Sequence, residues 1–347
     1  ERIDLFQALL ASELHSAFFR SDFIQPFQRH YSQHGIVAKA LSQMAFEGAV
    51  GGENRFPMTW SEEEEKIART TGWTVSTKHP QGSPKVAKAI LSFWTSDLKT
   101  LSESLKQQPN TPIPTLYERP FYKIGRYNFQ FPWVVAQQNN LTAAVNNLRR
   151  IDSRRKGQLD ETHRVEQRLA DLMRQKGFVV EVGYQPEKTE EEDPGEIDLI
   201  CFRDGVLLLL EVKSGYIRST THEIWLHRTK TLRKAAWQLR RKSVALRHAL
   251  AHDAALRDRL GYAESHANGP LHAWIVDTSI ELDQQRIDGF LVVSLESIHV
   301  ILRDECVLLS PFETLSEEPA VGFYPNGFSA RAFVRIVETG ALWKGLD

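Results

Sequence analysis

Cysteine is almost absent from this chain of 347 residues, which contains only Cys201 and Cys306. Two cysteines cannot form a disulfide framework or, by themselves, a four-ligand zinc site, so the sequence favours a reducing, cytoplasmic setting. Long apolar runs are also missing, because stretches such as 206–210 are far too short to cross a bilayer. The first residues lack the basic and apolar regions of a signal peptide. We therefore expect a protein that is neither secreted nor membrane-bound.

Several motifs of nucleotide and hydrolase chemistry are missing as well. The sequence contains no Gly-x-x-x-x-Gly-Lys-Ser/Thr loop and no Gly-x-Gly-x-x-Gly, which argues against an ATPase or a dinucleotide enzyme. It also lacks the His-Glu-x-x-His and Cys-x-x-Cys patterns of zinc sites and the Gly-x-Ser-x-Gly motif of serine hydrolases. The twelve histidines are scattered, although His222 and His227 lie close in sequence to the candidate site described below.

Charge is distributed unevenly along the chain, although the formal net charge is only −1. No acidic residue occurs from 224 to 252, a stretch rich in lysine and arginine, and a second basic cluster spans 149–156. Acidic residues gather instead at 61–65 and 187–193. This separation predicts a polarised surface, on which the basic stretch is available to phosphate groups.

The first 150 residues read as an α-rich module. Residues 3–19 are amphipathic, Ser61 and Glu64 have the spacing of a capping box, and 84–106 continues with helical periodicity. A polar, proline-rich stretch at 107–115 breaks this pattern. We expect residues 1–150 to serve recognition or regulation, including contact with a protein partner.

Residues 151–305 predict a second domain with an α/β fold. The expected order is a helix, three strands, a long basic helix, two strands and a helix, which gives a mixed sheet flanked by helices. The helices are expected at 160–176, 229–251 and 295–302, and the outer strands at 178–184, 272–277 and 290–294. Residues 306–347 remain a C-terminal tail without a predicted role.

Charged side chains stand at the end of an apolar hairpin between 196 and 214. Alternation along a strand places Glu211 and Lys213 on the same face, and a turn at Asp204-Gly205 brings Asp198 beside them. Such a pair on an exposed strand is usually a solvated ion pair of little consequence. Here four consecutive leucines precede Glu211, which predicts a buried central strand where a charge pair needs a reason.

This group of residues suits metal-assisted hydrolysis of a phosphodiester. Mg²⁺ or Mn²⁺ prefers carboxylate oxygens, so Asp198 and Glu211 are candidate ligands, with the backbone carbonyl of Val212 as a third. Lys213 then orients or deprotonates the attacking water, or stabilises charge on the phosphate. Glu166, on the helix before the strands, is a further candidate ligand, and Glu161 is the alternative to it.

In order and in residues, 158–300 resembles the PD-(D/E)xK, or restriction-endonuclease-like, nuclease superfamily. The family's acidic residue and its Glu-x-Lys motif match Asp198 and Glu211-Val212-Lys213. Residues 165–179 are similar to the first helix and strand of its resolvase-like and Mrr-like branches, whose helix often contributes a glutamate. The resemblance therefore favours Glu166 as a catalytic or metal-binding residue.

The resemblance also extends to the basic helix. Gln238 matches a glutamine that faces the active site in several branches, whereas Lys242 stands where a Gln-x-x-x-Tyr motif would have tyrosine. Ile197 replaces the name-giving proline. The resemblance implies the restriction-endonuclease-like fold and, often, a role in restriction or antiphage defence.

Two interpretations of the basic helix remain open. Its cations are either solvated surface or contacts that hold phosphates without reading sequence, for which the candidates are Arg233, Lys234, Arg240 and Arg241. Trp225 and Trp237 either stack on bases or belong to the core.

The sequence as a whole predicts a nuclease that depends on Mg²⁺ or Mn²⁺ and acts on DNA, with RNA as an open alternative. A non-catalytic nucleic-acid-binding or scaffold protein that retains the nuclease fold is the other hypothesis. Endonuclease or exonuclease action and association into a homodimer both remain open. The sequence opens on Glu1, which suggests a fragment or a processed chain.

Overall fold

The structure is a computed structural model that describes residues 5–51, 59–109, 111–151, 155–188, 193–218, 220–267, 269–305 and 322–343. Cys306, part of the acidic loop at 187–193 and most of the predicted tail lie outside these residues. The chain divides into two units, Glu1–Ser153 and Arg154–Asp347. No helix within the described ranges combines the length and the apolarity needed to cross a membrane.

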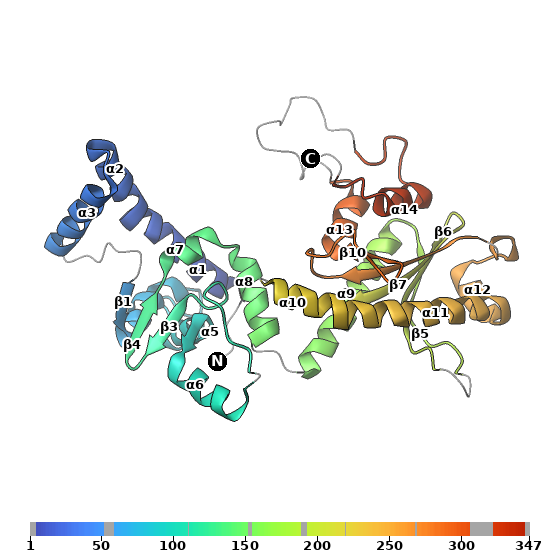
Figure 1. The fold of residues 1–347 in the computed structure, drawn as a ribbon, viewed down its shortest axis with the longest axis horizontal. Helices are drawn as coiled ribbons and strands as arrows, with labels where there is room; N and C mark the ends of the chain where they lie inside the picture. Colours follow the sequence, from blue (N-terminus) through green and yellow to red (C-terminus); the bar gives the residue numbers. More distant parts are fainter. Residues whose placement is uncertain are drawn as a thin grey trace. The chain divides into compact units, whose positions relative to one another are not determined.

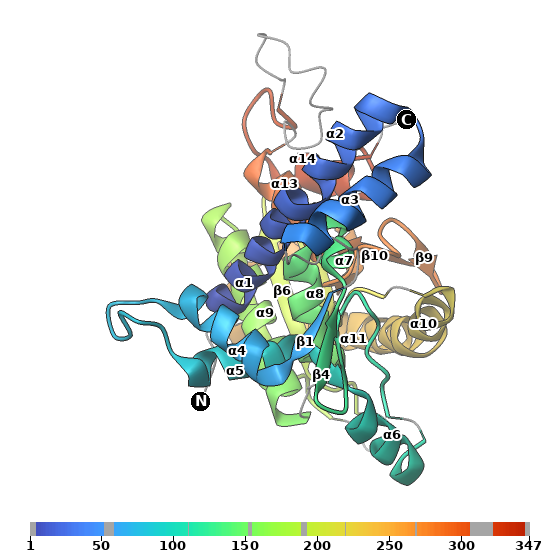
Figure 2. The same ribbon diagram turned by 90° about the vertical axis from the view of Figure 1, so that its left-hand side faces the viewer.

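Helices predominate in the first unit, which also contains a small sheet (Figure 1). Its strands follow the order β1-β4-β3-β2, in which only β2 and β3 pair in parallel. In Figure 1 and Figure 2, α2 and α3 lie side by side as a helical hairpin. The elements are α1 (Leu5–Phe19), the π-helix η1 (Arg20–Ile24), α2 (Gln25–His34), α3 (Val37–Gly51), β1 (Thr59–Glu62), α4 (Glu63–Thr71), η2 (Gly72–Thr74), α5 (Pro84–Trp94), β2 (Thr95–Asp97), α6 (Leu98–Gln107), β3 (Phe121–Ile124), β4 (Tyr127–Gln130), α7 (Pro132–Gln137), α8 (Asn140–Asn146) and the π-helix η3 (Asn147–Ile151).

Two local expectations for this unit were wrong. Ser61 lies in β1 and caps no helix, since α4 begins after Glu62, which makes no side-chain capping bond. The helical periodicity at 84–106 is divided by the short strand β2, which continues directly into α6, where Asp97 accepts hydrogen bonds from the backbone N–H groups of Lys99 and Thr100. An N-cap aspartate satisfies otherwise unpaired donors at the first turn, so it favours a new helix start within a pattern that looks continuous.

The second unit contains a sheet with the strand order β5-β6-β7-β8-β10-β9. Pairs β7–β8 and β8–β10 are parallel, and the other pairs are antiparallel, so the sheet is mixed and flanked by helices as predicted. The elements are α9 (Arg155–Gln175), β5 (Val179–Tyr184), β6 (Ile197–Arg203), β7 (Val206–Lys213), α10 (Thr221–Leu226), the π-helix η4 (His227–Leu232), α11 (Arg233–His252), α12 (Ala254–Leu260), η5 (Glu264–His266), β8 (Leu271–Asp277), β9 (Arg286–Ile287), β10 (Phe290–Ser294), α13 (Leu295–Arg303) and α14 (Ala330–Glu338).

The turn between β6 and β7 fixes the register of the hairpin. Asp204 and Gly205 both have positive φ, 51° and 75°, and Arg203 pairs with Val206 across them. A two-residue turn with two positive φ angles matches the twist of an antiparallel pair, which is why Asp-Gly favours it. The ladder continues from this turn to the pair Leu199 and Leu210.

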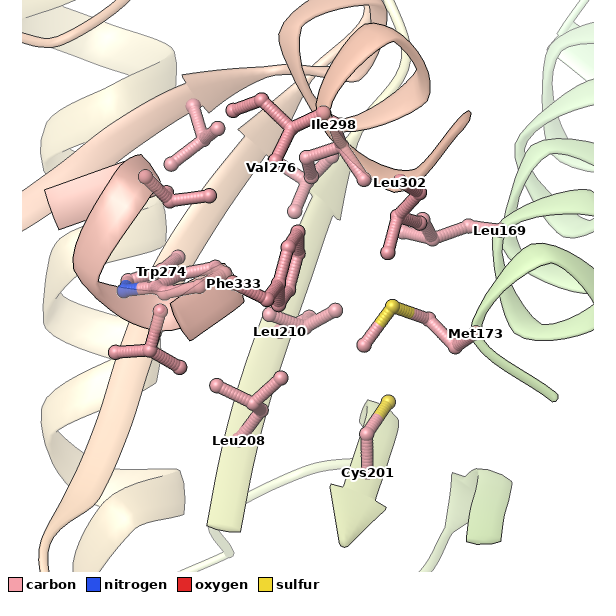
Figure 3. Close-up of a cluster of buried hydrophobic side chains, with 14 of the residues drawn as sticks. Leu169, Met173, Cys201, Leu208, Leu210, Trp274, Val276, Ile298, Leu302 and Phe333 are labelled. Carbon is pink, nitrogen blue, oxygen red and sulfur yellow. The ribbon is translucent and has the colours of Figure 1, made fainter. Parts of the chain in front are cut away.

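Each face of this sheet has its own hydrophobic core. One face packs under α9, α13 and α14, and Figure 3 shows Met173 of α9 and Phe333 of α14 gathered around Leu210 and Cys201. On the other face, Leu239 and Leu246 of α11 pack against the strands. Phe333 is fully buried, so the described part of the predicted tail belongs to the core of the second unit.

Candidate active site at the β6–β7 hairpin

The candidate site begins where the ladder of β6 and β7 ends. The last pair of the ladder is Leu199 with Leu210, so Asp198 and Glu211 lie opposite each other one residue further along. β7 is an interior strand, and Glu211 is only 1% exposed. A carboxylate buried to this degree needs positively charged or hydrogen-bonding partners.

Those partners come from two elements, β7 and α11. The Oδ2 atom of Asp198 accepts a hydrogen bond from the backbone N–H of Val212 at 2.7 Å, and its Oδ1 atom lies 3.0 Å from the Nζ atom of Lys242. Lys213 donates to Oε1 of Glu211 at 2.6 Å, and Lys242 donates to Oε2. Asp198, Glu211, Lys213 and Lys242 together carry no net formal charge.

Lys242 is the residue that the sequence reasoning missed as a member of the site. Its side chain is 4% exposed and extends from α11 to both carboxylates. Burial lowers the pKa of this lysine, but the charges and hydrogen bonds of Asp198 and Glu211 outweigh burial and raise the pKa above its ordinary value. The signal was present in the sequence, because Lys242 interrupts an apolar stripe between Leu239 and Leu246 at helical spacing.

Two further predicted residues lie near this group. Burial and the charge of Asp198 raise the pKa of Glu166, whose side chain is 13% exposed and 3.5 Å from the Nδ1 atom of His163. Gln238 lies one helical turn before Lys242, and its Oε1 atom is buried without a hydrogen-bond partner among the described residues. Glu161 is half-buried on the same helix as Glu166.

A histidine and an aspartate form a second buried pair beside the lysine of the hairpin. Asp277 ends β8 in register with Lys213 on β7, and its Oδ2 atom lies 2.5 Å from the Nε2 atom of His227. Both side chains are at most 5% exposed. Among the described residues His222 has no such partner, and its ring stacks on Trp225 with the ring centroids 6.1 Å apart. Asp277 was missed because only the sheet order brings β8 next to β7.

The donor atoms of the hairpin fit a hard divalent cation. Two carboxylates from neighbouring strands converge on one positively charged nitrogen, which identifies a position where a cation is stabilised. Within the described ranges, no group of three or more His, Cys, Asp or Glu side chains is arranged to hold a metal. An ion here would therefore rely on Asp198, Glu211, the carbonyl of Val212 and water, a ligand set typical of Mg²⁺.

Comparison with protein-family models, curated proteins and solved structures finds no match for this chain.

The predicted phosphate-binding residues lie along α11. Arg233, Lys234 and Arg240 are exposed, whereas the half-buried Arg241 stacks its guanidinium over Trp237 at 4.3 Å. Acidic and carbonyl oxygens lie near two of them, since Asp288 is 3.7 Å from Arg233 and its carbonyl accepts from Arg240 at 3.3 Å. Trp225 and Trp237 are 57% and 52% exposed, so neither belongs to the core.

Proposed function

We propose that this protein is a nuclease that depends on Mg²⁺ or Mn²⁺, hydrolyses DNA phosphodiester bonds, and has the restriction-endonuclease-like fold in its second unit. One observation carries the proposal: the carboxylates of Asp198 and Glu211, from two adjacent strands, converge on a single cation, and Lys213 contacts Glu211 from the same strand. Two carboxylates and a lysine of this kind suit metal-assisted phosphodiester hydrolysis.

Each residue of the hairpin has a distinct role in this chemistry. Asp198 and Glu211 would hold the ion, which when bound makes water acidic enough to react and neutralises charge on the phosphate. The backbone N–H of Val212 fixes the orientation of the Asp198 carboxylate through its 2.7 Å hydrogen bond. Lys213, whose side chain is 23% exposed, would orient the attacking water or stabilise the transferring phosphate.

The exposed cations of α11 supply the substrate contacts in this proposal. Arg233, Lys234 and Arg240 follow one another along a helix whose opposite side is buried in the core. Contacts from such side chains to phosphates position a strand without reading its sequence. The same contacts suit RNA, so RNA is the alternative substrate. The resemblance extends the proposal to restriction or antiphage defence.

A cleavage assay tests the proposed function. The full chain is incubated with supercoiled plasmid, linear duplex, single-stranded DNA and RNA, in magnesium and in excess chelator. We expect metal-dependent cleavage by the wild type, and a rate lower by roughly 100-fold or more in Lys213→Ala, because a positioned acid–base or electrostatic group is lost. Lys99→Ala, which removes an exposed lysine of the first unit, should cleave like the wild type. Equal rates for wild type and Lys213→Ala would remove Lys213 from the mechanism.

One observation favours the non-catalytic alternative. Lys242 already donates hydrogen bonds to both carboxylates, which is also how a nuclease fold without metal chemistry would stabilise them. Under this second proposal, the protein binds nucleic acid through α11 and cleaves nothing. Binding measured by fluorescence anisotropy, without cleavage of any of the four substrates in magnesium or manganese, would favour it over the nuclease.

A further inference from the structure

We propose that Lys242 is a resident counter-ion that competes with the divalent cation for Asp198 and Glu211, and that metal binding moves its ammonium towards Gln238. The inference rests on the proposed function, because it concerns the same two carboxylates. It assigns to this chain a site in which metal binding requires the exchange of one cation for another.

The contacts of Lys242 make it a member of the site itself. Its ammonium donates to Oδ1 of Asp198 at 3.0 Å and to Oε2 of Glu211, and its side chain is almost completely buried. An ammonium at this depth is stable only when it is paired. In return, it supplies a positive charge to two carboxylates that face each other from adjacent strands.

The same two oxygens are the ones that a shared metal ion would need. Lys213 donates to Oε1 of Glu211, and the N–H of Val212 donates to Oδ2 of Asp198. Oδ1 and Oε2 converge from the two strands, and they are the two atoms that Lys242 holds. Because like charges repel strongly where water is excluded, a divalent ion and the ammonium cannot both occupy that position.

The structure also contains a hydrogen-bond acceptor for the displaced ammonium. The Oε1 atom of Gln238 is buried and has no partner among the residues that the structure describes. Gln238 precedes Lys242 by four residues on α11, and side chains at that spacing are neighbours on one face of a helix. A lysine released from the carboxylates can therefore donate to this oxygen, which then gains the hydrogen bond that it lacks.

Calorimetric titration of the full chain with Mn²⁺ tests the exchange. We expect Lys242→Met to bind Mn²⁺ at least about tenfold more tightly than the wild type, because the competing charge is removed. Lys230→Met is the matched control, since it removes an exposed lysine from η4 and should leave the affinity unchanged. Asp198→Asn should abolish the binding heat and so assigns that heat to this site. Lys242→Gln, which keeps a polar side chain, replaces the methionine variant if the latter does not fold.

The destination has a separate test. Gln238→Leu removes the acceptor for the displaced ammonium, so we expect weaker Mn²⁺ binding than in the wild type, the opposite direction from Lys242→Met. Unchanged binding in Gln238→Leu would overturn the proposed destination.

The remaining outcomes distinguish the exchange from the nuclease proposal. Equal or weaker binding by both Lys242→Met and Lys242→Gln, in a wild type that cleaves DNA with magnesium, would overturn the exchange and leave the nuclease standing. Absence of Mn²⁺ binding in the wild type and in both variants would overturn the exchange and the metal-dependent nuclease together.

Discussion

Lys242 and Lys66 are both buried, but their ammonium groups are held in opposite ways. Two carboxylates surround Lys242 and raise its pKa, as described above. Lys66, in α4 of the first unit, donates instead to the neutral Oε1 atom of Gln130 at 2.6 Å. Burial, with a smaller contribution from the charge of Arg69, lowers the pKa of Lys66 to about 8. A buried ammonium is therefore stabilised in one unit and penalised in the other.

Stability as a function of pH follows from the lowered pKa of Lys66. Between the folded pKa of about 8 and the ordinary value of 10.5, the unfolded chain binds more protons than the folded chain. Stability of the first unit should therefore rise with pH across this window, by on the order of 3 kcal/mol at most. Below pH 8 the penalty is fully present. Lys66→Met should consequently be more stable than the wild type at pH 7.

Denaturant unfolding at several pH values measures this difference. The advantage of Lys66→Met should shrink as the pH rises from 8 to 10, because the wild-type lysine loses its proton in the folded state. The exposed Lys99 serves as the control, and Lys99→Met should show no comparable trend. A difference between wild type and Lys66→Met that stays constant from pH 7 to pH 10 would contradict the assignment.

At the scale of elements, α11 joins the core, the candidate site and the basic surface. Its buried side contains Leu239 and Leu246, and Lys242 lies between them on the same stripe. Its other side exposes Lys234 and Arg240. One helix thereby carries exposed cations within a few turns of the two carboxylates, so in the proposed function the contacts to a nucleic-acid strand and the chemistry would share one support.

Salt dependence should report the contribution of α11 to DNA binding. If Lys234 and Arg240 each contact a phosphate, Lys234→Ala and Arg240→Ala should weaken binding equally for unrelated duplexes. Each should lower the slope of log affinity against log salt by about 0.9, because one fewer counter-ion is released. Fluorescence anisotropy at several salt concentrations measures the slope, with Lys99→Ala as the control. An unchanged slope in both variants would place the DNA elsewhere.

Over the whole molecule, features that depend on short sequence segments could be predicted, whereas features that depend on contacts between distant segments could not. The Asp204-Gly205 turn, the leucines of β7 and the order of helices and strands are local signals, and the structure contains the hairpin, the interior strand and the mixed sheet. The proximity of Lys242 to the carboxylates depends on how α11 crosses the sheet, and that of Asp277 depends on β8 pairing with β7. Neither the crossing of α11 over the sheet nor the pairing of β8 with β7 can be inferred from a short sequence segment.

The C-terminal residues illustrate the same limit. Helix α14 has a strongly amphipathic sequence, with Phe333 and Val337 fully buried. Phe333 packs against Trp274 of β8 with the ring centroids 5.8 Å apart. An amphipathic helix reveals that it has an apolar face but not which surface covers it, so its place in the core of the second unit could not be predicted from the sequence.

The most direct test of the divalent-cation site is the anomalous scattering of Mn²⁺ in crystals of the full chain soaked with the ion. We expect one peak between the carboxylates of Asp198 and Glu211, with the Lys242 ammonium moved away from both, and no peak there in Asp198→Asn. Crystals that contain Mn²⁺ elsewhere, or none, while Lys242 still bridges both carboxylates would contradict the central claim that this hairpin is a divalent-cation site.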